Sequence, residues 1–197
     1  MPVTISDVTL FHDSNVLPQP APPVFEWIAK NHSFNSQLWD EEDLARRTKA
    51  SDAEIAANKR AIDKFNQARN DAVERMDEML LVALNIADPK AVSAQARLHS
   101  ETAGAMIDRL SILALKIRAM KKQTDRADVD AAHIASSQSK LSQLQQQRAD
   151  LAENCQQLLR NCATGTEFFK IYRQFKMYND PRYNPVLVAE NAVAKST

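Results

Sequence analysis

Residues 141–162 read LSQLQQQRADLAENCQQLLRNC and contain the pattern that decides the fold. Apolar side chains and one arginine recur there at alternating steps of three and four residues, at Leu141, Leu144, Arg148, Leu151, Cys155, Leu158 and Cys162. Such a seven-residue repeat places all of these side chains along one seam of a helix that packs against other helices. The stretch therefore predicts a helical bundle or a coiled coil.

The flanking sequence extends this pattern into several long helices joined by short links. We expect helices over residues 24–47, 52–86, 102–123, 126–163 and 167–177, and a break in the first near 31–33 is left open. Ser51 and Glu54 form a capping box, Asp125 is expected to cap the fourth helix, and Gly165 to end it. The predicted fold is all-α, an antiparallel bundle of four to five long helices. Residues 1–21 are expected to be an irregular leader, 22–185 the helical domain, and 186–197 a flexible tail.

The composition excludes several classes of protein. Two glycines in 197 residues are far fewer than the usual ~7%, and hairpins and phosphate-binding loops need glycine at positive φ. Sandwiches, barrels, Rossmann domains and P-loop enzymes are therefore not expected. The 25 basic and 25 acidic side chains cancel, whereas a general nucleic-acid binder needs a basic excess to neutralise phosphates.

Targeting signals and cysteine usage predict a cytoplasmic protein. The first residues lack the basic and apolar regions of a signal peptide, and no stretch approaches the ~20 apolar residues of a membrane span. Cys155 and Cys162 lie two helical turns apart, roughly 10 Å, which is too far for a disulfide. We expect both to be buried thiols.

Charged and amide side chains interrupt the apolar faces of four expected helices. Residues 102–123 are apolar in nearly every direction, yet they include Asp108, Arg109 and Lys116. Because an unpaired buried charge is strongly destabilising, such groups need a partner or a ligand. The other helices offer partners at the inward positions Asn35, Glu42, Arg69 and Arg148. Beside these positions lie Asp43, Arg46, Asp63, Asn66 and Asn70.

Two interpretations of this set stay open. Buried Arg, Glu and Asn networks can serve only to fix the register of a bundle. Alternatively, the arginines and Lys116 bind an anionic small molecule while a carboxylate exchanges protons. Glu101 adds a carboxylate where free N–H groups at a helix start also favour an anion. Arg173 and Lys176, beside tyrosines, suit either a ligand contact or a helix packed as a lid.

The candidate site residues follow from these positions. Glu42 and Asp108 are the candidate catalytic residues. The candidate ligand-binding residues are Asn35, Asp43, Arg46, Asn66, Arg69, Asn70, Glu101, Arg109, Lys116, Arg148, Arg173 and Lys176. No metal or cofactor is predicted, because a di-iron bundle needs Glu-x-x-His on two helices and no such pair occurs. Neither cysteine nor Ser111 has an obvious base for covalent catalysis.

Most of residues 34–185 resembles a bacterial family described as domain of unknown function 4254. The resemblance lies in NSQLWDEEDLAR at 35–46, KRAID at 59–63, Asn66, RND at 69–71, SETAGAMIDRLSILALK at 100–116, QR at 147–148 and YRQFKMYNDP at 172–181. The family pattern has Pro-Gly where this chain has Ala103-Gly104. Membership implies no established activity, but the family's association with glycosyltransferase and lipopolysaccharide genes implies surface-polysaccharide biosynthesis.

Two functions are therefore expected as alternatives. In the first, the bundle binds an anionic sugar or nucleotide-type metabolite at its internal polar site, as an enzyme or as an accessory protein. In the second, the protein is a non-catalytic interaction module that docks onto a glycosyltransferase or self-associates, and its buried charges are purely structural. Neither alternative involves nucleic acid or a membrane span.

Overall fold

Helices account for most of the residues that the structure describes. The computed structural model describes residues 3–88, 90, 92–174, 177 and 180–194. Its helices are α1 (Ile5–Ser14), α2 (Phe25–Ala45), α3 (Asp52–Ala83), α4 (Ala103–Thr124), α5 (Ala131–Thr164) and α6 (Pro185–Ala194). Two short strands, β1 (Arg97–Leu98) and β2 (Glu167–Phe168), pair in parallel. The predicted all-α class is confirmed.

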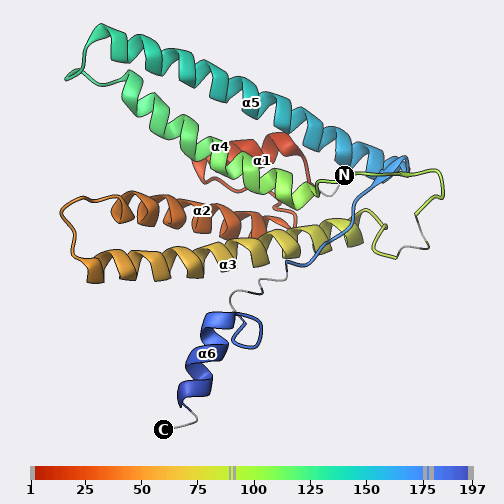
Figure 1. Cartoon of the computed structure of the whole chain (residues 1–197). Coiled ribbons are helices and arrows are strands. Elements are labelled where there is room, and N and C mark those ends of the chain that lie inside the picture. The colour runs from red at the N-terminus through yellow and green to blue at the C-terminus, as the bar shows by residue number, and fades with distance from the viewer. Residues whose placement is uncertain (1–2, 89, 91, 175–176, 178–179, 195–197) are drawn as a thin grey trace.

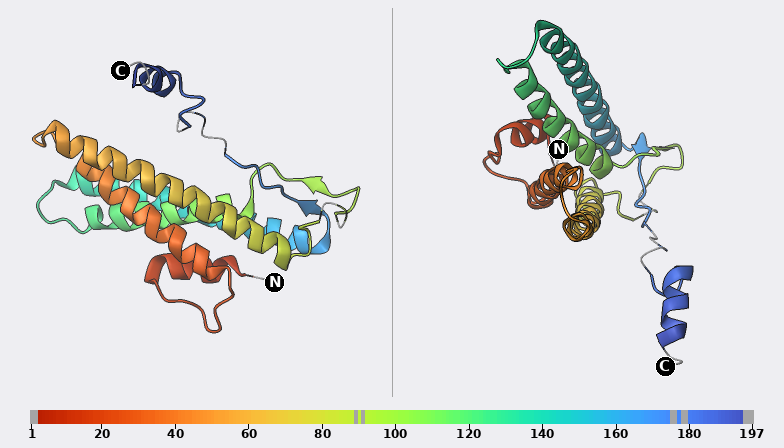
Figure 2. Two further views of the ribbon diagram at one scale, coloured as in Figure 1. Left: turned by 90° about the horizontal axis from the view of Figure 1, so that it is seen from below. Right: turned by 60° about the vertical axis from the view of Figure 1, so that its left-hand side comes forward.

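The four long helices form two hairpins (Figure 1). Residues 46–51 join α2 to α3, and residues 125–130 join α4 to α5. Helix α4 packs against both α2 and α3 and so holds the hairpins together. The hairpins lie close at one end and diverge toward the ends that carry these two connections, as Figure 2 also shows. In the described part of the chain, no helix is both long and apolar enough to cross a membrane.

Local sequence signals set most of the helix ends. The capping box of Ser51 and Glu54 starts α3 as predicted, and Gly165 ends α5 in the left-handed conformation at φ 73°. The prediction that Asp125 caps α5 is wrong. Asp125 follows the last turn of α4, and Asp130 caps α5 by accepting a 2.7 Å hydrogen bond from a backbone N–H of its first turn.

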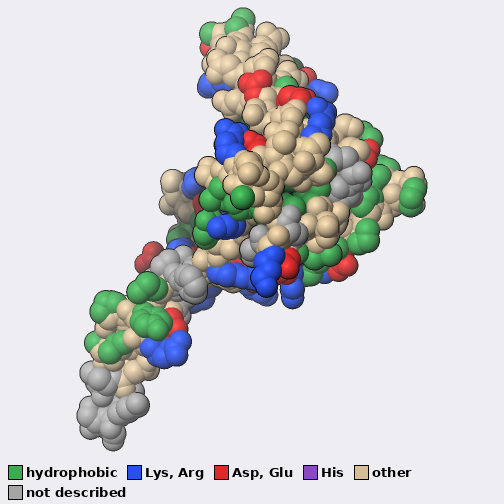
Figure 3. Space-filling view, turned by 90° about the vertical axis from the view of Figure 1, so that its right-hand side faces the viewer, with side chains coloured by type: hydrophobic (Ala, Val, Ile, Leu, Met, Phe, Trp, Pro, Cys, Tyr) green, Lys and Arg blue, Asp and Glu red, His purple; other side chains and the backbone are tan. Residues whose placement is uncertain are grey.

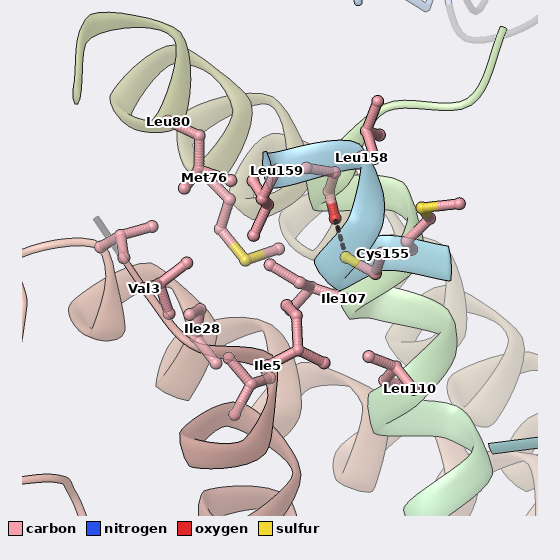
Figure 4. Packing of buried hydrophobic residues seen from close by; sticks show 14 of the residues in the cluster. Val3, Ile5, Ile28, Met76, Leu80, Ile107, Leu110, Cys155, Leu158 and Leu159 are labelled. Atoms are coloured by element: carbon pink, nitrogen blue, oxygen red, sulfur yellow. Dashed lines mark hydrogen bonds between the residues drawn. The ribbon is translucent and has the colours of Figure 1, made fainter. Parts of the chain in front are cut away.

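The prediction of an irregular leader is wrong for residues 5–14, which form α1. Thr4 caps this helix by accepting from the backbone N–H of Asp7. The apolar face of the segment is buried against α4 and α5, and it consists of Val3, Ile5, Val8 and Phe11. Figure 4 shows Val3 and Ile5 among side chains of the long helices. The N-terminal segment is therefore part of the hydrophobic core.

The core joins both hairpins through α4. Its fully buried members include Ile28 from α2, Met76 and Leu80 from α3, Ile107 and Leu110 from α4, and Leu158 and Leu159 from α5 (Figure 4). Cys155 and Cys162 are buried free thiols, as predicted. Burial raises the pKa of each thiol to about 12, so neither is a thiolate nucleophile at neutral pH.

Helices α3 and α4 approach closely at Gly104. A Cβ built on Gly104 would lie 2.7 Å from Oδ1 of Asp77 and 2.8 Å from the backbone oxygen of Val73. No side chain fits there, so glycine is required by the contact between two helices. The Gly104 N–H donates a 2.6 Å hydrogen bond to the buried Asp77 carboxylate. This contact fixes the start of α4 against α3.

The C-terminal region differs from both predictions made for it. The helix expected over 167–177 is absent from the residues described there, because 167–168 form β2 and 169–174 are not helical. The Glu167 carboxylate accepts from Arg97 and Asn161, which favours strand pairing at this point. The tail expected from 186 onward is largely helical, as α6. Figure 3 shows hydrophobic side chains gathered on this projecting region.

Candidate functional site

A cavity of about 580 Å³ opens between α2, α3 and α4. Its walls come from the diverging halves of these helices. Its lining residues are Asn35, Leu38, Trp39, Glu42, Asp43, Arg46, Ile62, Asn66, Arg69, Ile112, Leu115 and Lys116. Seven of the candidate site residues are among them: Asn35, Glu42, Asp43, Arg46, Asn66, Arg69 and Lys116. We call this cavity the polar pocket.

Asp108 lies beneath this pocket and holds a network of amides. Its Oδ1 accepts 2.8 Å hydrogen bonds from the side-chain nitrogens of Asn31 and Asn35. The side chain is 13% exposed, and its Oδ2 lies 4.0 Å from Nε of Arg69. Asp108 is not among the residues that line the pocket. Its carboxylate therefore orients Asn35 and Arg69, which do line it.

Arg69 has an unused hydrogen-bond donor. Its Nε is buried and has no acceptor within hydrogen-bond distance, although it faces Asp108. One terminal nitrogen donates to the side-chain oxygen of Asn70 at 3.1 Å. The buried Nε faces Asp108 and not the solvent. A guanidinium carries five N–H donors, so the terminal groups of Arg69, whose side chain is 26% exposed and lines the pocket, are the ones able to bind a further acceptor.

The other polar groups of the wall differ in how they are paired. Glu42 and Arg46 form an ion pair at 2.7 Å on the rim, where both side chains are exposed. An exposed pair of this kind contributes little to stability and exchanges partners easily. No hydrogen bond or ion pair joins the side chains of Asp43, Asn66 or Lys116 to any described residue. The pocket thus presents a free cation, a free carboxylate and a free amide.

A buried histidine pair extends the network away from the pocket. His32 Nδ1 lies 2.8 Å from Oγ of Ser111, which also accepts from Asn35. The ring of His12 stacks on His32 with centroids 4.8 Å apart, and neither of its nitrogens has a partner among the described residues. Burial lowers the pKa of both histidines, that of His12 to about 3. Both rings are therefore neutral at physiological pH.

The two histidines, Asn31 and Ser111 belong to this network but are not among the site residues predicted from the sequence. The break considered near residues 31–33 removed Asn31 and His32 from the apolar face of the first helix. In the structure, α2 continues through this region without interruption. A continuous helix places Asn31 and Asn35 one turn apart, so the spacing itself was a usable signal.

Five candidate residues lie outside the polar pocket in ion pairs or hydrogen bonds of their own. Arg109 pairs with Glu101 at 2.7 Å, and Arg148 pairs with Asp13 of α1 at 2.6 Å. Arg173 pairs with two glutamates of α3, Glu74 and Glu78. Asn70 contacts Arg69 and donates to Gln174 at 3.1 Å. Lys176 lies outside the described residues.

The expectation that Arg109 and Lys116 are buried charges is wrong. The Arg109 side chain is 56% exposed and Lys116 is also exposed. Because the hairpins diverge, α4 is not surrounded on all sides along its length. Both residues line a neighbouring cavity between α4 and α5, of about 610 Å³. Lys116 thus lines three cavities from a single position: the polar pocket, this one and a third of about 420 Å³.

Asp77 is a buried carboxylate that the sequence did not reveal. Burial raises its pKa to about 7, against hydrogen bonds from Thr102 and from the Gly104 N–H, which favour the charged form. It lies at the start of α4, where free N–H groups attract a negative charge. The only sequence signal was Gly104, whose missing side chain makes room for this carboxylate.

No cluster of three or more histidine, cysteine, aspartate or glutamate side chains that could hold a metal ion occurs within the described ranges. The polar pocket offers amide and guanidinium donors, a lysine, two carboxylates and the ring of Trp39. These groups suit a ligand with both anionic and hydroxyl groups.

Comparison with known proteins gives one match. The model of the family described as "Protein of unknown function (DUF4254)" matches residues 25–171, which include α2 to α5 and all residues of the polar pocket. Searches among curated proteins and among solved structures returned no match.

Proposed function

Because the chain belongs to the DUF4254 family, whose function is unknown, we propose a function from its own residues: it binds a sugar phosphate or similar anionic, hydroxyl-rich metabolite in the polar pocket. One observation carries this proposal. Around a cavity of about 580 Å³, Lys116, Asn66 and Asp43 make no hydrogen bond or ion pair with other described residues, and the 26% exposed side chain of Arg69 lines the same cavity. Volumes of ~300–1,000 Å³ are typical of small-molecule sites.

The cations of the pocket define the anionic end of the ligand. Lys116 on α4 and Arg69 on α3 approach the cavity from different helices. A phosphate between them accepts charge-assisted hydrogen bonds from both, and a guanidinium matches two phosphate oxygens at once. Asp108 keeps the guanidinium in place from below, at 4.0 Å. Asp108 thus holds Arg69, and Arg69 and Lys116 bind the phosphate, which explains why an acidic side chain lies beneath a site for an anion.

The carboxylates and amides define the rest of the ligand. Sugar hydroxyls both donate and accept, so they match Asp43 as an acceptor and Asn35 and Asn66 as mixed partners. Trp39 and the neighbouring aliphatic side chains cover the apolar face of a ring. If the ligand reacts, Glu42 is the carboxylate that exchanges protons, because it borders the cavity whereas Asp108 does not.

We also propose that the two hairpins form one antiparallel bundle whose helices move little on binding. The protein then acts in the bacterial cytoplasm, in surface-polysaccharide biosynthesis, a process that consumes phosphorylated sugars. The buried network supports the pocket in this view, so the charges are structural and functional at once.

Calorimetric titration with a panel of phosphorylated sugars that includes glucose 1-phosphate tests the proposal. Lys116→Met should weaken binding by roughly 10- to 100-fold, because a hydrogen bond to a charged group contributes about 1.5–3 kcal/mol. Lys121→Met removes another exposed lysine from the same helix and should leave the affinity unchanged. An equal effect of both substitutions, or no binding of any sugar phosphate, refutes the proposal.

The alternative function, an interaction module, has one observation in its favour. Helix α6 exposes Val186 and Val188, at 63% and 45%, and contiguous exposed apolar side chains mark interaction surfaces. An apolar cavity of about 470 Å³ between residues 22–24 and the end of α3 is a matching surface on the same chain. In a symmetric dimer, each α6 fills this cavity of the other copy. Light scattering should then show a dimer that Val186→Asp converts to a monomer, and a monomeric wild type refutes self-association through α6.

A further inference from the structure

A second cavity shares a wall with the polar pocket. It has a volume of about 420 Å³ and lies between α4 and α5, next to α2. Its lining residues are Trp39, Lys116, Ala119, Met120, Gln123, Lys140, Gln143, Leu144 and Gln147. Trp39 and Lys116 line both cavities. The second cavity, which we call the amide pocket, is therefore adjacent to the first.

The amide pocket differs in chemistry from the polar pocket. Its inner surface is formed by the half-buried Trp39, Ala119, Met120 and Leu144, and it has no acidic lining residue. Three glutamines surround this apolar surface. The side chains of two of them, Gln143 and Gln147, make no hydrogen bond to any residue in the described ranges. Their amides offer both donors and acceptors.

A flat heteroaromatic ring is complementary to such a surface, because its faces are apolar and its edge is polar. Proteins bind nucleobases by covering the faces with aromatic or aliphatic side chains and by hydrogen-bonding the polar edge. Trp39 and Leu144 offer the apolar faces, and the glutamines offer the edge contacts. An acyl chain also fits an apolar cavity, but it gains no hydrogen bonds from these amides, whereas the polar edge of a ring does.

Lys116 lies at the junction of the two cavities. It has no ion-pair partner among the residues that the structure describes, and Lys140 of the amide pocket has none either. Two unpaired lysines beside an apolar cavity favour a negative charge between the ring and the polar pocket. In a ligand whose diphosphate joins a nucleoside to a sugar, the negative charge lies between the base and the sugar, next to Lys116.

We propose that the polar pocket and the amide pocket are two subsites for one ligand, a nucleoside diphosphate sugar. The sugar occupies the polar pocket, the diphosphate contacts Lys116, and the base occupies the amide pocket. This inference rests on the proposed function, because it assigns the sugar to the same site. It goes further by defining the ligand as a nucleotide and by giving α5 a role in binding.

Titration calorimetry with UDP-glucose, GDP-mannose and dTDP-glucose, each compared with its sugar 1-phosphate, tests the inference. One nucleotide sugar should bind at least tenfold more tightly than its sugar 1-phosphate. Met120→Trp fills the amide pocket and should abolish this difference without changing the affinity for the sugar 1-phosphate. The matched control, Val82→Trp, introduces the same side chain at a 69% exposed position near the end of α3 and should change neither affinity.

A smaller substitution covers the case in which Met120→Trp fails to fold. Gln143→Leu replaces an exposed side chain and should weaken only the nucleotide sugar, by three- to tenfold. If the sugar 1-phosphates bind as tightly as every nucleotide sugar, the inference is wrong while the proposed function stands. If geranyl phosphate binds more tightly than all nucleotides and Gln143→Leu leaves it unaffected, the second cavity is a lipid site and the inference is also wrong. If no sugar phosphate or nucleotide sugar binds, both proposals fail.

Discussion

Replacing Asp77 by asparagine should change how the stability of the fold depends on pH. Burial raises the pKa of this carboxylate from an ordinary 3.8 to about 7. The difference corresponds to about 4 kcal/mol at 1.36 kcal/mol for each tenfold change in proton affinity. Because residue Asp77 is only 2% exposed, solvent screens little of this energy.

The direction follows from proton binding in the two states. Between pH 3.8 and 7 the unfolded chain loses the Asp77 proton while the folded chain keeps it, so the stability contributed by this group falls as pH rises. Above pH 7 the folded protein carries the full destabilisation of a buried charge. The asparagine of the variant has no such charge. The free energy of unfolding of Asp77→Asn, minus that of the wild type, should therefore increase by up to about 4 kcal/mol from pH 4 to pH 8.

The wild type alone does not report this effect, because His12 acts in the opposite direction. Its pKa is lowered to about 3 by burial, so protonation of the unfolded chain below pH 6.5 destabilises the fold as pH falls. Between pH 4 and 6.5 the two contributions largely cancel. The difference between Asp77→Asn and the wild type removes the histidine contribution, since both proteins contain it.

Urea denaturation followed by circular dichroism at pH 4.5 to 8.5 measures this difference. Asp63→Asn is the control, because Asp63 is an exposed carboxylate of the same helix that pairs with Lys59. A difference between Asp77→Asn and the wild type that stays constant over this range would refute the reasoning. It would mean that Asp77 ionises as readily in the folded as in the unfolded protein.

Three further substitutions test other parts of the structure. Asp108→Ala should destabilise the fold by about 3 kcal/mol in chemical denaturation, because it removes two hydrogen bonds to a charged acceptor; an unchanged melting temperature would show that the network is dispensable. Gly104→Ala should cost about 1–3 kcal/mol, since its Cβ would overlap Asp77 and a backbone oxygen, and a neutral result would mean that α3 and α4 move apart easily. Phe11→Ala should cost about 3–5 kcal/mol by creating a cavity under α1, and a loss below 1 kcal/mol, measured by urea denaturation, would show that α1 packs only loosely.

Local sequence signals predicted a helix end correctly where the sequence offered a single clear capping or terminating residue. Ser51 and Gly165 are examples, because Glu54 completes a capping box with Ser51 and Gly165 is the one glycine near its junction. The loop 125–130 contains Asp125, Asp128 and Asp130, any of which is able to cap a helix. The choice of Asp130 depends on how the hairpin closes, and that information is tertiary.

The N-terminal helix shows a signal that was present but misread. Thr4 with Asp7 resembles a helix start, and Asn15 takes the left-handed conformation typical of a helix end, at φ 57°. The prolines that follow, at 18, 20, 22 and 23, favoured the interpretation of the whole segment as irregular. A helix of ten residues is marginal in isolation, so only its burial against α4 and α5 makes it stable.

For the candidate site, the position of a residue around its helix predicted whether its side chain faces inward, but not which other helix it meets there. Asn35, Arg69 and Lys116 point toward the polar pocket because their positions on three helices converge there. Arg148 also lies on an inward seam, yet it faces α1 and pairs with Asp13. The periodicity of one helix gives no information on which other helix covers a given face, and the leader had been expected to be irregular.

The close contact at Gly104 also sets a rule for related sequences. Lys116 lies twelve residues further along α4, about 18 Å at 1.5 Å per residue. Inserting one residue between them would rotate Lys116 by about 100° around the helix axis and remove it from both pockets. Length changes should therefore be tolerated in the connections 46–51 and 125–130 but not between 104 and 116. Because the fully buried Ile107 and Leu110 lie in the same interval, an altered spacing there is expected to disturb the core as well as the ligand site.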